Sequence, residues 1–144
     1  KSIKNADSYT WGDGCTGWHL LKTDGLSVIQ EKMPPGTSEQ HHFHNPATTI
    51  LYSIGVATFE VDGQVFIINA KESIHIPKMT NHCIANKGNE DLEFLVISEP
   101  KSHGDRQFFD AEVVLVEQRG NQKLETRKKK WECLESRTAR RTFI

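Results

Sequence analysis

Apolar and polar residues alternate over short stretches of the chain from residue 26 to about residue 98. Short stretches rich in Val, Ile, Leu and Phe, bounded by Gly, Pro, Asn or Asp, are typical of β-strands. Asp62-Gly63 separates two of these stretches and is a strong hairpin signal. Evenly spaced short strands predict an all-β sandwich or barrel, and no helical period is convincing before residue 120. The predicted strands are 26–31, 50–54, 56–61, 65–68, 73–76, 82–85 and 92–97.

The end of the chain has a different pattern. Residues 108–116 suit one more strand, whereas residues 121–141 are rich in helix formers. The sizeable apolar residues there, Leu124, Trp131 and Leu134, have the spacing of one weak helical stripe. This part is interpreted as a solvated or partly disordered extension, with a dimer-bracing arm and a contact for an anionic partner as the alternatives. We therefore divide the chain into an N-terminal arm (1–19), a barrel (20–106) and a basic C-terminal extension (107–144), for which a helix is one expectation.

Composition is that of one globular domain. The chain has 144 residues, of which 36% are hydrophobic and 26% charged. It has no apolar run near the ~20 residues that a membrane-spanning helix needs, and its first residues lack the apolar stretch of a secretory signal. The three cysteines, Cys15, Cys83 and Cys133, are far apart and form no CxxC pair. This usage fits a reducing compartment, and we expect a cytoplasmic protein without a membrane partner.

Charge is distributed unevenly along the chain. Residues 1–120 carry ten Lys/Arg and sixteen Asp/Glu, and residues 121–144 carry eight and three, although the whole chain has a net charge of only −1. The tail includes the basic run 127–130. Nucleic-acid binding depends largely on phosphate neutralisation, so an acidic main domain is a poor match for it. We expect no nucleic-acid partner.

Three of the seven histidines, His41, His42 and His44, fall within four residues. Strand residues two positions apart point to the same face, so His42 and His44 can face one interior point while His41 points the other way. A His-x-His pair alone is a weak metal signal, because solvated or hydrogen-bonded histidines are common.

The spacing around this pair resembles the two motifs of the cupin superfamily. The first motif, Gly, five residues, His-x-His, a gap, Glu, six residues and Gly, is matched from Gly36 to Gly55 except at its Glu. The second, Pro-x-Gly, two residues, His, three residues and Asn, is matched from Pro77 to Asn86 except at its Gly. The chain thus resembles a small single-domain cupin over about residues 20–106. Residues 98–106 also have a weaker likeness to small sugar-isomerase-like cupins.

This resemblance implies a jelly-roll-like double-stranded β-helix with one divalent metal ion near its centre. The residues carried over as ligands are His42, His44 and His82. Thr48 stands where the family has its metal-binding Glu. The second motif also has a glycine ahead of its Pro, and Lys71 and Met79 stand at its two glycine positions. Three neutral imidazoles leave the ion its full charge and about three open positions, and they do not select among iron, nickel, zinc, manganese and copper.

Neighbouring residues complete the expected site. If Thr48 faces inward, Ile50, Tyr52 and Ile54 do as well, which makes Tyr52 a candidate to donate a proton or position oxygen. Gln40, two residues before His42, is a candidate fourth ligand or substrate contact. We expect Thr48 not to coordinate the ion. A packed core tyrosine and a surface amide are the alternative interpretations of Tyr52 and Gln40.

Three functions follow from this reading. The first is a metal-dependent enzyme on a small anionic or oxygen-rich molecule, either an oxygenase by analogy with three-His cupins that oxidise thiols, or a sugar-type isomerase. The second is a module that binds a small ligand without turnover, and the third is a structural, metal-holding dimer. Neither motif contains a general-base carboxylate, which favours the oxygenase over the isomerase. Because Trp11 and Trp18 add aromatic surface, we also expect a homodimer that buries at least one of them.

Overall fold

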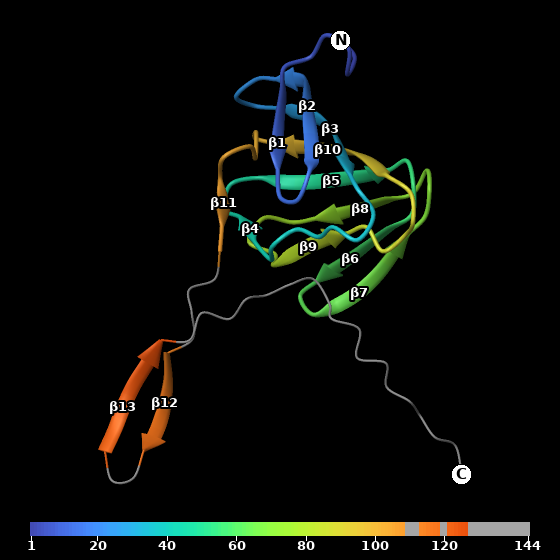
Figure 1. Ribbon diagram of the computed structural model, residues 1–144. Helices are drawn as coiled ribbons and strands as arrows, with labels where there is room; N and C mark the ends of the chain where they lie inside the picture. The colour runs from blue at the N-terminus through green and yellow to red at the C-terminus, as the bar shows by residue number, and fades with distance from the viewer. Residues whose placement is uncertain (109–112, 119–120, 127–144) are drawn as a thin grey trace, which may run out of the picture.

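The protein, seen here in a computed structural model, is described for residues 1–108, 113–118 and 121–126, and its regular elements in these ranges are all β-strands (Figure 1). None of these residues belongs to a helix that could span a membrane. The strands are β1 (Ser8–Trp11), β2 (Cys15–Lys22), β3 (Ser27–Met33), β4 (Phe43–His44), β5 (Thr48–Ser53), β6 (Ala57–Val61), β7 (Gln64–Ile68), β8 (Ser73–Ile76), β9 (His82–Ala85), β10 (Leu92–Glu99), β11 (Arg106–Gln107), β12 (Val113–Gln118) and β13 (Asn121–Thr126).

Two main sheets form a β-sandwich of the double-stranded β-helix type. A six-stranded sheet has the order β1-β2-β3-β10-β5-β8, and a three-stranded sheet has the order β7-β6-β9. The short strands β4 and β11 pair with each other at one end of the sandwich (Figure 1). Within the described residues the strand pairings are antiparallel, and several of them, such as β10 with β3 and β11 with β4, bring residues distant in sequence into direct register.

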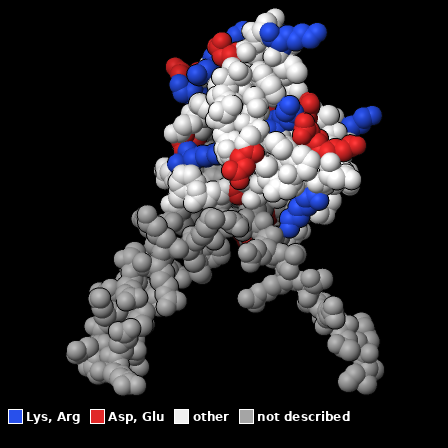
Figure 2. Space-filling view, in the orientation of Figure 1, with Lys and Arg blue, Asp and Glu red and all other residues white. Residues whose placement is uncertain are grey.

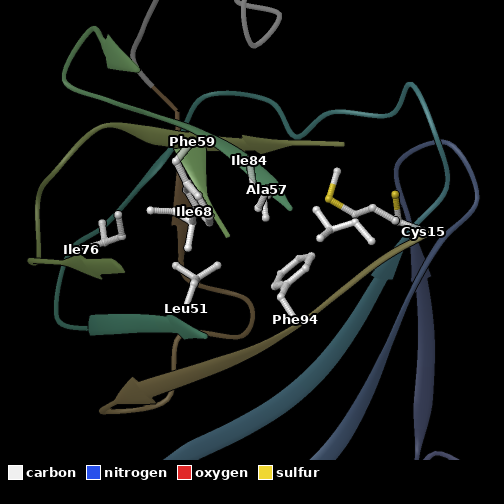
Figure 3. Packing of buried hydrophobic residues seen from close by; sticks show 10 residues of the cluster. Cys15, Leu51, Ala57, Phe59, Ile68, Ile76, Ile84 and Phe94 are labelled. Carbon is white, nitrogen blue, oxygen red and sulfur yellow. The ribbon is translucent and has the colours of Figure 1, made fainter. Parts of the chain in front are cut away.

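The hydrophobic core lies between the two main sheets (Figure 3). Leu51 and Phe94 come from the six-stranded sheet, and Phe59, Ile68 and Ile84 from the three-stranded sheet. All five are buried, and burying an aliphatic or aromatic side chain of this size contributes about 1.5–3 kcal/mol. The core fills one end of the space between the sheets, which leaves the end near β4 and β11 for polar residues.

The hairpin expected at Asp62-Gly63 is confirmed. Strands β6 and β7 pair from Ala57↔Ile68 to Val61↔Gln64, and both turn residues have positive φ, at 47° and 79°. A two-residue turn of this kind matches the right-handed twist of the flanking strands, and Asp-Gly suits it because Gly adopts positive φ at no steric cost. The turn therefore sets the register of this edge of the smaller sheet.

Strand β5 has the opposite phase to the one expected. Thr49, Leu51 and Ser53 are its buried residues, whereas Ile50 and Tyr52 are exposed by 42% and 37%. The inward orientation considered for Thr48, Ile50, Tyr52 and Ile54 is therefore not the one that the structure has, since Ile50, Tyr52 and Ile54 are exposed. Hydrophobicity could not decide between the two phases, because two threonines stand side by side and both faces of the strand carry large apolar residues.

The chain ends differ from the sequence-based picture in two places. β1 and β2, expected as an arm, extend the larger sheet through antiparallel pairing of β2 with β3. Residues 121–126, where a helix was one expectation, form β13 and pair with β12. The boundaries proposed at residues 19 and 106 remain predictions, and Trp131, Leu134 and the basic run 127–130 lie outside the described residues.

Two positions at which the cupin motif carries glycine keep a glycine-like backbone. Lys71 has φ 70° and Met79 has φ 63°, both in the left-handed region that disfavours side chains with a Cβ. The Met79 amide donates to the His44 carbonyl at 2.7 Å, so this conformation ties the segment before β9 to β4. The loop shape is thus preserved without the residue that adopts it most easily.

We expect Met79→Gly to raise the free energy of unfolding by about 1 kcal/mol, because glycine relieves the left-handed strain and the Met79 side chain is more than half exposed. Chemical denaturation is the measurement. Lys78→Gly is the matched control in the same loop: its φ is not positive, so the added backbone entropy should destabilise the protein. Equal effects at the two positions would contradict the assignment of strain to Met79.

Candidate metal centre and its cavity

His42, His44 and His82 meet at one end of the sandwich. Each offers a ring nitrogen, and these three atoms lie within 4.8 Å of one another. The ring centroids of His42 and His82 are 4.4 Å apart, those of His42 and His44 are 4.9 Å apart, and all three residues are buried. The sequence-predicted ligands therefore form one group.

Backbone hydrogen bonds position these histidines. His42 and His82 form an isolated antiparallel bridge, in which the amide of each donates to the carbonyl of the other, at 3.1 and 2.9 Å. The segment before His42 continues along β9, where the Glu39 amide donates to the Ile84 carbonyl at 2.9 Å. His44 follows two residues later on β4. The strand alternation read from His-x-His thus places both side chains on one side.

In each of the three rings, Nδ1 already has a hydrogen-bond partner, which leaves Nε2 as the nitrogen for a metal ion. His42 Nδ1 lies 2.9 Å from the Gln40 carbonyl oxygen, and His82 Nδ1 lies 2.8 Å from that of Thr80. His44 Nδ1 lies 2.5 Å from Asp105 Oδ1. A carbonyl or carboxylate oxygen only accepts, so each Nδ1 carries the proton, and in the neutral form of the ring Nε2 keeps a lone pair. This tautomer suits metal ligation, and outer hydrogen bonds of this kind orient ligating rings.

Two of the three imidazoles, those of His42 and His82, are also held neutral. Burial lowers the pKa of His42 to about 4, against a smaller raising effect of Glu39, and burial likewise lowers the pKa of His82. Uncharged imidazole is the form that binds a metal, so no proton has to be displaced from these two rings at neutral pH. Burial, tautomer and convergence together fit a divalent ion held by three nitrogens.

The three rings line a cavity of about 440 Å³, a size that suits a small molecule. Arg106 on β11 lies opposite His44 on β4, and its guanidinium donates to the buried carboxylate of Glu39. The guanidinium carbon also lies 5.4 Å from the centre of the Trp11 ring. Glu31 on β3 and Tyr9 on β1 line the same cavity.

The Arg106–Glu39 pair sets the charge beside the histidines. Burial alone raises the pKa of Glu39, but Arg106 and the nearby imidazoles outweigh it and the net pKa is lowered. The same Glu39 charge raises the pKa of Arg106. Both groups are therefore ionised at neutral pH, and the pair places a guanidinium at the cavity wall without adding net charge.

The other residues considered from the sequence lie elsewhere. The Gln40 side chain is exposed, and it is its carbonyl that contacts His42. Tyr52 is on the outer face of β5, outside the cavity lining. Thr48 Oγ1 contacts His75 Nε2 at 2.7 Å on that outer face. His41 points away from the three-histidine group, as expected, and its Nε2 lies 3.3 Å from Glu60 Oε2.

Glu31 and Arg106 come from outside the two motifs, and Glu39 stands at one of the unspecified positions between Gly36 and His42, so motif spacing could not reveal them. One sequence signal was present. In the alternating stretch Ser27–Met33 the inward positions are Ser27, Ile29, Glu31 and Met33, which puts an acidic residue on a buried face. A charge at such a position is rarely structural, since buried carboxylates need partners.

Comparison with known proteins agrees with this geometry. Residues 29–98 match the family model described as a cupin domain. The oxalate-binding protein of Thermotoga maritima is 32% identical over 85 residues, which cover 55% of this chain and 70% of that protein. The chain belongs to the cupin family. A mannose-1-phosphate guanylyltransferase of Salmonella montevideo is 35% identical to this cupin over 69 residues, which are 48% of this chain but only 14% of that protein.

Solved structures share the fold of this cupin. A Thermotoga maritima protein described as a predicted oxalate decarboxylase has a TM-score of 0.63 at 24% identity, and the match covers 69% of this chain and 97% of that one. At this identity the likeness establishes the double-stranded β-helix and nothing about the reaction.

We expect Asp105→Asn to weaken zinc binding by about ten- to a hundredfold, because the carboxylate that orients His44 loses its charge. Competition with a chromophoric chelator measures the affinity. Asp91→Asn is the control, since Asp91 is exposed and makes only a 3.8 Å ion pair with Lys32. Equal zinc affinity in the two variants would mean that Asp105 does not support the site.

Proposed function

We propose that this cupin holds one divalent metal ion on His42, His44 and His82 and binds a small, oxygen-rich anion beside it. The observation that carries the proposal is the arrangement of the three rings. Each Nδ1 is occupied by an acceptor, and the three imidazoles converge with their other nitrogens available. A divalent ion on such a set supplies a Lewis acid with open positions.

Arg106 is the protein's own anion-binding group in this proposal. Its guanidinium is held by Glu39 and by the Trp11 ring, so little freedom is lost when it contacts a ligand. A planar guanidinium also matches the two oxygens of a carboxylate. The similarity to a protein named for oxalate binding supports a small dicarboxylate as the probe.

A metal-dependent enzyme is the second candidate, and the carboxylates in the cavity favour it. The sequence-based preference for an oxygenase rested on the absence of an acid–base group from the motifs. Glu31, outside the motifs, and Glu39, at an unspecified position of the first motif, both line the cavity, so acid–base chemistry such as isomerisation is now the better supported of the two reactions. Oxygen consumption with iron restored, screened over thiols, diketones and phenols, tests the oxygenase.

The first test measures metal content. Protein purified without an affinity tag should retain about one divalent ion per chain, and His82→Ala should lose it. His75→Ala is the control, because that histidine is exposed and bonded to Thr48 on the outer face of β5. Equal retention in both variants would contradict the three-histidine site. The identity of the retained metal would choose among iron, nickel, zinc, manganese and copper.

The second test measures binding of oxalate by calorimetry. We expect binding to the metal-loaded protein and none to chelator-treated protein, because without the ion Arg106 is balanced by Glu39. The double variant Arg106→Gln, Glu39→Gln removes both charges together, so no buried charge is left unpaired. It should bind oxalate roughly ten- to a hundredfold more weakly, the usual range for one lost charged hydrogen bond, with unchanged metal content. Full affinity in this variant would exclude Arg106 as the anion contact.

The proposal also includes a homodimer. Trp11 and Trp18, expected at the interface, are half-buried, and Trp11 also lines the cavity. Among the described residues, edge strand β7 exposes the apolar Val65, Phe66 and Ile67. In Figure 2 the Lys, Arg, Asp and Glu side chains are scattered over the visible face, with uncharged residues of all kinds between them. Exposed apolar surface of this kind and an unpaired strand edge both favour association. Light scattering at micromolar concentration should give the mass of two chains, and the mass of one would exclude the dimer.

A further inference from the structure

Tyr9, Gly17 and Glu31 lie opposite one another on three adjacent strands. Tyr9 pairs with Gly17 between β1 and β2, and Gly17 pairs with Glu31 between β2 and β3. A Cβ atom at position 17 would lie 2.4 Å from Tyr9 Cζ, so the phenol ring lies directly over the glycine. The ring thereby spans β2, and its hydroxyl donates to Glu31 Oε1 at 2.6 Å.

This pair belongs to the metal-site cavity and not to the packed core. Tyr9 and Glu31 line the cavity together with the three histidines and Arg106. Glu31 is 5% exposed, and its register partner on β10 is the buried Phe94. The carboxyl group thus faces the cavity from an apolar wall, where ionisation is costly.

Four titratable groups act on Glu31. They are Tyr9 from β1, Cys15 from β2, Glu39 from the segment between β3 and β4, and Arg106 from β11. Burial and the Glu39 charge raise the pKa of Glu31 to about 7, although the Tyr9 hydrogen bond and Arg106 act in the opposite direction. Burial and Glu31 in turn raise the pKa of Tyr9, so its hydroxyl remains a donor.

We propose that Glu31, oriented by Tyr9, is the residue that takes up a proton when an anion binds in the cavity beside the three histidines. This inference rests on the proposed function. An anion in the cavity adds negative charge near Glu31, as Glu39 already does, and so favours its neutral form. The carboxylate takes one proton from solvent as the anion binds, and the resulting O–H donates to a ligand oxygen. No bond within the ligand is broken.

In a turnover reaction the same group serves as acid and base. The Glu31 carboxylate accepts a proton from a C–H or O–H bond of the ligand, whose electron pair stays on the ligand. Glu31 then returns the proton to another ligand atom. Such a proton shift balances without an oxidant or co-reactant, and it has the form of an isomerisation.

Calorimetry tests this inference without requiring turnover. Oxalate is titrated into metal-loaded protein at pH 8 in two buffers with different enthalpies of ionisation, and the difference between the observed heats gives the number of protons taken up. Wild-type protein should take up about one proton per oxalate, since Glu31 is mostly ionised at this pH before binding. Glu31→Gln should bind oxalate with no uptake. Glu93→Gln, a carboxamide change on the half-buried Glu93 of β10, should leave the uptake unchanged.

The outcomes separate the two proposals. Absence of oxalate binding to the wild type would overturn both. Binding without proton uptake, or the same uptake in Glu31→Gln, would overturn this inference alone. Tyr9→Phe serves as the second variant if Glu31→Gln does not fold. Loss of the Tyr9 hydrogen bond raises the pKa of Glu31, so the pH of half-maximal uptake should move upward. An unchanged pH profile in Tyr9→Phe would contradict the role given to the pair.

Discussion

Two reciprocal hydrogen bonds between His42 and His82 hold together the part of the molecule on which its chemistry depends. They form an isolated bridge that joins the segment after β3 to the start of β9. The amides and carbonyls involved are main-chain groups, so this link between the two backbone segments needs no side-chain hydrogen bond. A third main-chain bond, from Met79 to the His44 carbonyl, adds the remaining ring. Main-chain hydrogen bonds thus fix the backbone positions of all three histidines.

Packing in the apolar core restrains the backbone that carries the three histidines. Ile84, one of the largest fully buried residues, lies in β9 two positions after His82, and Phe59 faces it from β6 in direct register. A close-packed interior of this type resists small displacements, because every shift opens a cavity or forces an overlap. The polar end and the apolar end of the sandwich are therefore coupled through the same short strand, β9. The exact positions of the histidine rings therefore also depend on how Ile84 and Phe59 pack in the core.

Much of the fold was predictable because it depends on local patterns. The strands from β3 to β10 follow alternation and turn residues, and Asp62-Gly63 sets its hairpin by backbone preference alone. The grouping of His42, His44 and His82 was predictable from motif spacing. The phase of β5 was not, since Thr48 and Thr49 are chemically identical and only the tertiary structure distinguishes them.

The remaining cavity residues escaped prediction for a different reason. Glu31, Arg106 and Tyr9 come from β3, β11 and β1, and their proximity follows from the pairing of strands far apart in sequence. Nothing local to Arg106 indicates that β11 pairs with β4. Replacement of glycine by Lys71 and Met79 appeared to weaken the motif match, yet the backbone keeps the left-handed conformation there. A motif can thus persist as a backbone shape after its characteristic residues have changed.

The ring of Tyr9 resting on Gly17 has an evolutionary consequence. Any residue other than glycine at position 17 would place a Cβ atom inside the space of the phenol ring. A lineage that loses this glycine must therefore also lose the tyrosine contact, and Glu31 would then lack its hydroxyl donor. The three positions should covary as one unit. Among related sequences, the triplet Tyr–Gly–Glu at these positions would mark a subgroup by a feature that neither histidine motif records.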